Sequence, residues 1–148
     1  MDGISRYLCS DHARCDDFFI SAERNVNSKD WDVATTFFRE FAESLEHHFA
    51  MEEKVLFTAF EQEIGHASGP TVIMRMEHAQ LRELLAQLQN ALEQRDANAY
   101  LGYSDTLNTM MQQHNLKEES VLYPMADRML AGREREIVEA MAALEVIA

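Results

Sequence analysis

The sequence predicts an all-α fold, an up-down antiparallel four-helix bundle followed by a short extra C-terminal helix. Three observations support this prediction. The 148 residues include only five glycines and two prolines, the residues that separate the short strands of sandwiches and barrels. Four long segments repeat apolar residues every three or four positions, which is the period of an amphipathic helix. Short connections between long helices make neighbouring helices antiparallel.

The first two helices are indicated by apolar stripes and a candidate cap. The first is expected from about Ile4 to Asn25. The second is expected to begin near Ser28 or Asp30, because either side chain can accept a hydrogen bond from the first helical turn. It should end by Gly65. The two stripes contain Ile4, Leu8, His12, Cys15, Phe19, Ala22 and Val26, then Ala34, Phe37 or Phe38, Phe41, Leu45, His48, Glu52, Val55 or Leu56, and Ala59.

A turn from Gly65 to Gly69 separates the second helix from the third. Pro70 suits the first turn of the third helix, where its missing N–H costs nothing. Asp96 is the candidate cap of the fourth helix, and Pro124 should kink or shorten the end of that helix. The two stripes contain Met74, His78, Leu81, Leu85, Leu88 and Leu92, then Tyr103, Leu107, Met110 or Met111, His114, Glu118, Val121 or Leu122, and Met125.

The chain length suits one domain covering residues 1–148. Within it, the bundle is expected over about 4–130 and the short C-terminal helix over about 133–147.

The charge and the cysteines limit the partners and the location. The formal net charge of −13 repels phosphate backbones and anionic lipid, so neither nucleic acid nor a membrane is an expected partner, whereas cations are compatible. No signal-peptide-like apolar stretch begins the sequence, so a cytoplasmic location is expected. Cys9 and Cys15 would lie ~9 Å apart along one helix, too far for a disulfide, so free thiols are expected.

An internal repeat relates the two halves of the chain with an offset of 66 residues. The offset superposes His12 on His78, His48 on His114, Glu52 on Glu118, Glu53 on Glu119, and Val55-Leu56 on Val121-Leu122. The matches concentrate at polar positions. Two helix pairs related in this way would pack with approximate two-fold symmetry and bring the two polar sets together.

These polar side chains occupy core positions. Four histidines lie on four different stripes, and each half carries a His and a Glu four residues apart, on one face of its helix. A buried carboxylate is costly unless it is protonated, paired or bound to metal. Because no Lys or Arg lies on the stripes at this level, cations are the expected charge partners. The candidate metal ligands are His12, His48, Glu52, His78, His114 and Glu118.

Six such ligands suit two metal ions. Imidazole and carboxylate together favour Fe, Zn, Mn or Co, and a single structural zinc needs only four ligands. If both carboxylates bridge, each metal receives two imidazoles and two carboxylate oxygens. A bridging oxide or hydroxide would leave one open position on each metal for a small molecule. Two bridging carboxylates would hold the metals about 3.5–4 Å apart.

The motifs around these residues resemble the hemerythrin-like, or HHE cation-binding, family. They are Asp11-His12, HHFAMEE at 47–53, EHAQL at 77–81 and HNLKEESVLYP at 114–124. The resemblance covers roughly residues 4–130. It implies a four-helix bundle around a non-haem di-iron centre, with the four histidines as terminal ligands and the two glutamates as bridges. Family members bind dioxygen, respond to oxygen or nitric oxide, handle iron or repair iron centres.

The sequence departs from the oxygen-carrying members at two positions. Their fifth histidine corresponds to Met74, which leaves both metals with an open or water-filled position and disfavours simple reversible oxygen carriage. Their second bridging carboxylate corresponds to Glu119, whereas the repeat and the face of His114 favour Glu118. Glu119 remains the alternative.

The leading interpretation is a di-iron protein that binds dioxygen or nitric oxide, in oxygen or nitric oxide response or in iron handling. One alternative is a di-iron oxidase, peroxidase or nitric oxide reductase. Another is a protein that repairs iron centres, donates iron or senses iron. A redox or iron-accepting protein partner is compatible with these interpretations, and the sequence does not identify it. Several nearby side chains are assigned supporting roles. Glu53, Glu77 and Glu119 could orient imidazoles, Met74 and Met111 could limit ligand access, and Tyr7, Tyr103 and Tyr123 are interpreted as packing residues.

Overall fold

The computed structural model describes residues 3–66 and 69–144, and within these residues the chain is almost entirely helical and contains no strand. The N-terminal half forms α1 (Gly3–Asn27) and a second long rod. The second rod runs through α2 (Trp31–Ala50), the π-helical segment η1 (Met51–Leu56) and α3 (Phe57–Ile64). The C-terminal half repeats this plan with α4 (Gly69–Glu93), followed by α5 (Ala97–Lys117), the π-helical segment η2 (Glu118–Leu122) and α6 (Tyr123–Met129).

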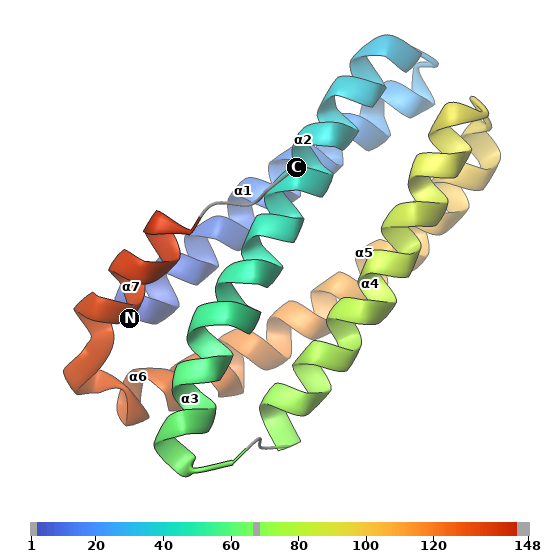
Figure 1. Cartoon of the computed structure of the whole chain (residues 1–148). Helices are drawn as coiled ribbons and strands as arrows, with labels where there is room; N and C mark the ends of the chain where they lie inside the picture. Colours follow the sequence, from blue (N-terminus) through green and yellow to red (C-terminus); the bar gives the residue numbers. More distant parts are fainter. Residues whose placement is uncertain (1–2, 67–68, 145–148) are drawn as a thin grey trace.

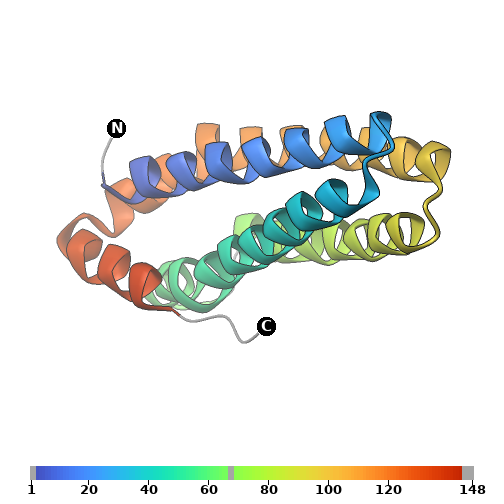
Figure 2. The same cartoon turned by 90° about the horizontal axis from the view of Figure 1, so that it is seen from above.

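These four rods form the predicted bundle. Figure 1 shows α1 beside α2 and α4 beside α5, and Figure 2 shows that the two pairs meet along α1 with α5 and α2 with α4. After a single 3₁₀ turn (Ala131–Arg133), α7 (Glu134–Ala143) packs against α1 and η1. The prediction of an extra C-terminal helix is confirmed over these residues, and positions 145–147 of the expected helix lie outside the described residues.

The helix ends follow the predicted signals. Asp30 and Asp96 cap α2 and α5, because their carboxylates accept hydrogen bonds from the backbone N–H groups of Val33 and Ala99. Gly65 ends α3 in the left-handed conformation, with φ of 86°, which glycine adopts without a steric penalty.

The π-helical segments were not predicted. Both lie at equivalent places in the repeat and begin at or next to the glutamates of the candidate metal site. The α-helix ends before Pro124, at Lys117, but the helical path continues through η2 to Met129. Pro124 lies in the first turn after η2, where its missing N–H is accommodated, so it does not terminate the rod.

The polar candidate residues separate two apolar clusters. One cluster fills the end of the bundle that contains the α1–α2 and α4–α5 connections, and includes Phe19, Phe41, Leu88 and Tyr100. The other lies at the end covered by α3, α6 and α7. The predicted stripe of the fourth helix was wrong at Tyr103, which is 37% exposed. The buried face of this helix instead begins at Tyr100 and continues through Ser104, four residues later, to Leu107, three residues after that.

In the described ranges, every helix is either too short or too polar to cross a lipid bilayer.

Candidate metal centre

The structure brings all six predicted ligands together in the interior of the bundle. His12 comes from α1, His48 from α2 and His78 from α4, each facing the axis at the same level. Glu52 and Glu118 come from the two π-helical segments, and both side chains are 0% exposed. The six buried side chains are His12, His48, Glu52, His78, His114 and Glu118.

The inner nitrogen atoms of the histidines converge on the two glutamates. The Nε2 atoms of His48 and His78 lie 3.5 and 3.1 Å from Oε1 of Glu52. The Nε2 atoms of His12 and His114 lie 3.1 and 3.4 Å from the carboxylate of Glu118. Each glutamate therefore contacts one histidine from its own helical rod and one from another rod.

The outer nitrogen atoms of the histidines meet a second ring of carboxylates. His48 Nδ1 lies 2.8 Å from Asp11, and His114 Nδ1 lies 2.8 Å from Glu77. His78 Nδ1 lies 2.7 Å from Glu53. His12 Nδ1 lies 2.7 Å from Glu119. An ionised carboxylate only accepts hydrogen bonds, so each Nδ1–H donates, and in neutral imidazole this leaves Nε2 as the free donor atom for a metal.

Basic side chains support the outer carboxylates. Arg14 binds Asp11, Arg82 binds Glu53, and Lys117 binds Glu77. Although burial raises the pKa of Asp11, hydrogen bonds from His48 and Arg14 lower it to about 2. The pKa values of Glu53 and Glu77 are lowered in the same way, so Asp11, Glu53 and Glu77 are ionised at neutral pH and hold their imidazoles in one orientation.

The charges of the inner groups shift the pKa values of their neighbours. Although burial lowers the pKa of His12 and His78, the adjacent Glu118 and Glu52 raise each to about 9. Burial lowers the pKa of His48. Burial and the charge of Glu118 raise the pKa of Glu52. Protons and cations therefore compete for the same atoms, and binding of a metal would release protons.

Unpaired polar atoms mark a place for a cation. Oε1 of Glu52 and Nε2 of His78 lie 3.1 Å apart, and Oε2 of Glu118 and Nε2 of His114 lie 3.4 Å apart, but none of these four buried atoms makes a hydrogen bond. Such atoms are costly unless something binds them. One ligand atom from each of these four side chains fits within 4.8 Å of the others, and a second such group combines His12, His48 and Glu118. The donor set fits a pair of metal ions.

The Glu118 and Glu119 alternatives are separated in space. Glu118 is fully buried and faces His12 and His114, whereas Glu119 is 41% exposed and lies on the outer side of His12. The same arrangement holds for Glu52 and Glu53 around His78. The widened π-helical turns allow adjacent glutamates to reach opposite nitrogen atoms of one imidazole ring.

Two residues of the site were missed or misjudged. Asp11 was assigned no role, although the 66-residue offset places it on Glu77, and that match was the available signal. Tyr123 was interpreted as a packing residue, but its buried hydroxyl donates to Glu52 over 2.7 Å. Burial and the charges of both glutamates raise the pKa of this phenol well above its usual value.

The surroundings of the site differ between the halves. Phe49 stacks on His78 with ring centroids 4.0 Å apart, which covers that imidazole. His12 instead borders a pocket of about 340 Å³ that is also lined by Met111 and Asn115. A limit on ligand access from Met111 is consistent with this position and stays a prediction, as it does for the buried Met74.

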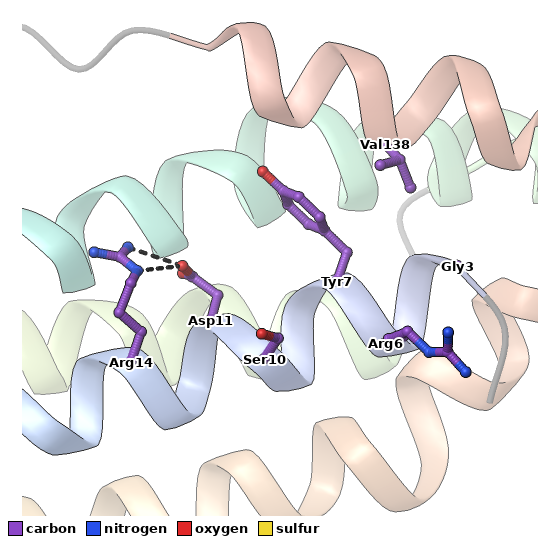
Figure 3. Close-up of a pocket in the computed structure, with 7 residues that line it drawn as sticks. All are labelled: Gly3, Arg6, Tyr7, Ser10, Asp11, Arg14 and Val138. Carbon is purple, nitrogen blue, oxygen red and sulfur yellow. Dashed lines mark hydrogen bonds and ion pairs between the residues drawn. The ribbon is translucent and has the colours of Figure 1, made fainter.

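A second pocket lies behind Asp11, between α1 and α7 (Figure 3). The paired side chains of Asp11 and Arg14 line it together with Arg6 and Tyr7. The carboxylate of Asp11, which accepts the hydrogen bond from His48, therefore lies near solvent.

The two cysteines are both free, as expected. Cys15 is buried and Cys9 partly buried.

The family model described as the hemerythrin HHE cation binding domain matches residues 4–126 of the chain. The chain therefore belongs to the hemerythrin HHE cation-binding family, and the bundle and the His/Glu cluster make it a metal-binding, hemerythrin-like protein. No curated protein and no solved structure matches the chain.

The outer carboxylates provide a first prediction. Asp11→Ala and Glu77→Ala should each lower the affinity for Fe²⁺ roughly 10–100-fold, because residues that orient a ligand imidazole contribute about this much. Anaerobic competition with a coloured chelator measures the affinity. The matched control, Asp17→Ala, removes an exposed acid from the same helix and should change little. Equal affinities for all three variants would contradict the role of the outer ring.

Proposed function

We propose that this protein holds two iron ions between Glu52 and Glu118 and binds a small diatomic molecule, dioxygen or nitric oxide, at that centre. The observation that carries the proposal is the convergence of four histidine Nε2 atoms on two fully buried carboxylates. Membership of the hemerythrin family supports iron as the metal.

Each side chain then has a distinct task. His12 and His48 would hold one metal, and His78 and His114 the other. Glu52 and Glu118 would bridge, since each lies between histidines of different rods. Glu119 would orient His12 from outside and would not bridge.

A pair of iron ions supplies open coordination positions and one-electron chemistry to a small molecule. The chain contributes the shape and polarity around it. Phe49 and Phe57 stack on His78, so the surroundings of that imidazole are apolar. The buried Met74 provides no imidazole at the position of the fifth histidine of the oxygen carriers. An accessible coordination position favours sensing or scavenging over oxygen transport.

We also propose a cytoplasmic location, supported by the two free thiols.

Gas titration of the reduced, iron-loaded protein tests the proposed function. In a sample kept free of air, stepwise addition of nitric oxide should change the visible spectrum, and the change should saturate at a fixed ratio of nitric oxide to protein. A second sample of the reduced protein is then titrated with dissolved dioxygen. The Glu118→Ala variant serves as the control, since it removes a bridging carboxylate. A protein with two irons that responds to neither gas would contradict the proposal. Sustained consumption of nitric oxide or hydrogen peroxide would instead indicate an enzyme.

A further inference from the structure

The two halves of the metal centre differ at one aromatic position. The 66-residue offset superposes Tyr123 on Phe57. The two rings have nearly the same surroundings. Tyr123 stacks on His12 and Phe57 stacks on His78, both with ring centroids 5.7 Å apart and with interplanar angles of 25° and 21°. The backbone places one aromatic ring on each metal position, but only one ring carries an oxygen atom.

The Tyr123 oxygen lies among the donor atoms of its half. It is 2.7 Å from Oε2 of Glu52 and 3.1 Å from Oε1 of Glu118. It is 3.2 Å from Nε2 of His12 and 3.4 Å from Nε2 of His48. Two ligands at right angles around one metal, each about 2.1 Å from it, are about 3 Å apart. The hydroxyl oxygen therefore has the spacing of a further ligand of the same metal.

The Phe57 half shows the complementary pattern. The unpaired buried atoms of the four candidate ligands all belong to that half: Oε1 of Glu52, Nε2 of His78, Nε2 of His114 and Oε2 of Glu118. The corresponding atoms of the Tyr123 half each contact the hydroxyl group. A metal held by His12 and His48 would thus have an additional protein oxygen beside it. A metal held by His78 and His114 would have only the phenyl ring of Phe57 beside it.

We propose that the Tyr123 hydroxyl would release its proton to solvent when metal binds and that its oxygen would be a ligand of the metal held by His12 and His48. The two metals would then be inequivalent, and an external ligand would bind the metal held by His78 and His114. This inference rests on the proposed function, since it requires the metal pair. A simple hydrogen-bond role for Tyr123 toward Glu52 is the competing explanation, and it predicts no contact between the phenol oxygen and the metal.

Spectroscopy of the ferric protein tests the proposal directly. A phenolate bound to ferric iron gives a charge-transfer band in the visible region, and Raman excitation within that band enhances the tyrosine ring vibrations. We expect both signals in the unsubstituted protein with two irons per chain. An iron-loaded protein without tyrosine vibrations would overturn the proposal. A protein that takes up no iron would instead refute the proposed function, so iron content separates the two failures.

Two matched variants extend the test. Tyr123→Phe should lose both the band and the tyrosine vibrations, because it removes the phenol oxygen. Phe57→Tyr should gain a second phenolate contribution and lose azide binding, because the new oxygen would fill the open position. Azide binding that survives in Phe57→Tyr would contradict the assignment of the external ligand to the His78 and His114 metal.

Discussion

Replacement of Glu118 with alanine is expected to lower the iron content of the purified protein from about two ions per chain to fewer than one. Glu118 is the only carboxylate that belongs to both candidate ligand groups of the described residues. Its loss removes a donor from each metal position and leaves His12 and His114 without their inner partner. Plasma mass spectrometry of protein from an iron-replete host measures the result, with circular dichroism to verify that the helices are retained.

The adjacent residue supplies the control for this experiment. Glu119→Ala removes the same charge from the same helical segment but from the outer side of His12. It should keep most of its iron and bind it more weakly. If Glu119→Ala loses both ions while Glu118→Ala retains them, Glu119 is the bridging carboxylate and the assignment from the repeat is wrong.

Removal of the metal should lower the melting temperature by roughly 10 °C. A ligand present at 1,000 times its dissociation constant stabilises the folded state by about 4 kcal/mol, and 1 kcal/mol shifts the melting temperature of a protein of this size by roughly 2–4 °C. The site is sensitive to this loss because Glu52 and Glu118 are both fully buried and close to one another. Thermal scans of the iron-loaded protein with and without a strong chelator measure the shift.

Two further scans make the thermal result specific. Addition of Fe²⁺ in excess of the chelator should restore the original melting temperature. The Glu118→Ala variant should respond little to the chelator, since it holds little iron. An equal shift in the variant would show that the chelator acts elsewhere on the chain, and an unchanged melting temperature in the parent protein would contradict a metal that stabilises the bundle.

Much of the fold followed from simple patterns. The apolar period defined the four rods, and the carboxylates of Asp30 and Asp96 are found at the predicted helix starts. The polar residues on the stripes identified the interior cluster, because burial of Glu52 and Glu118 between apolar neighbours demands a charge partner. Their role as ligands stays a prediction, whereas the contacts between them and the histidines are visible in the structure.

Other features depend on tertiary geometry that periodicity does not encode. The contacts of Glu53 with His78 and of Glu119 with His12 agree with the predicted role of these acids in orienting imidazoles. The π-helical turns that carry them were not predicted, because a fixed period of 3.6 residues does not encode such turns. Tyr123 looked like an ordinary core aromatic because its hydroxyl is explained only by side chains from other rods. Tyr103 was assigned to the wrong face because a tyrosine suits a buried stripe and a rim equally well.

The most direct test of the central claim is the count of metal ions in protein purified from an iron-replete host. The arrangement of four histidines around two buried glutamates predicts about two irons per chain, with little zinc. A single zinc, or a protein without metal that takes up no Fe²⁺ under anaerobic conditions, would contradict the di-iron centre. The proposed binding of dioxygen or nitric oxide would then fail with it.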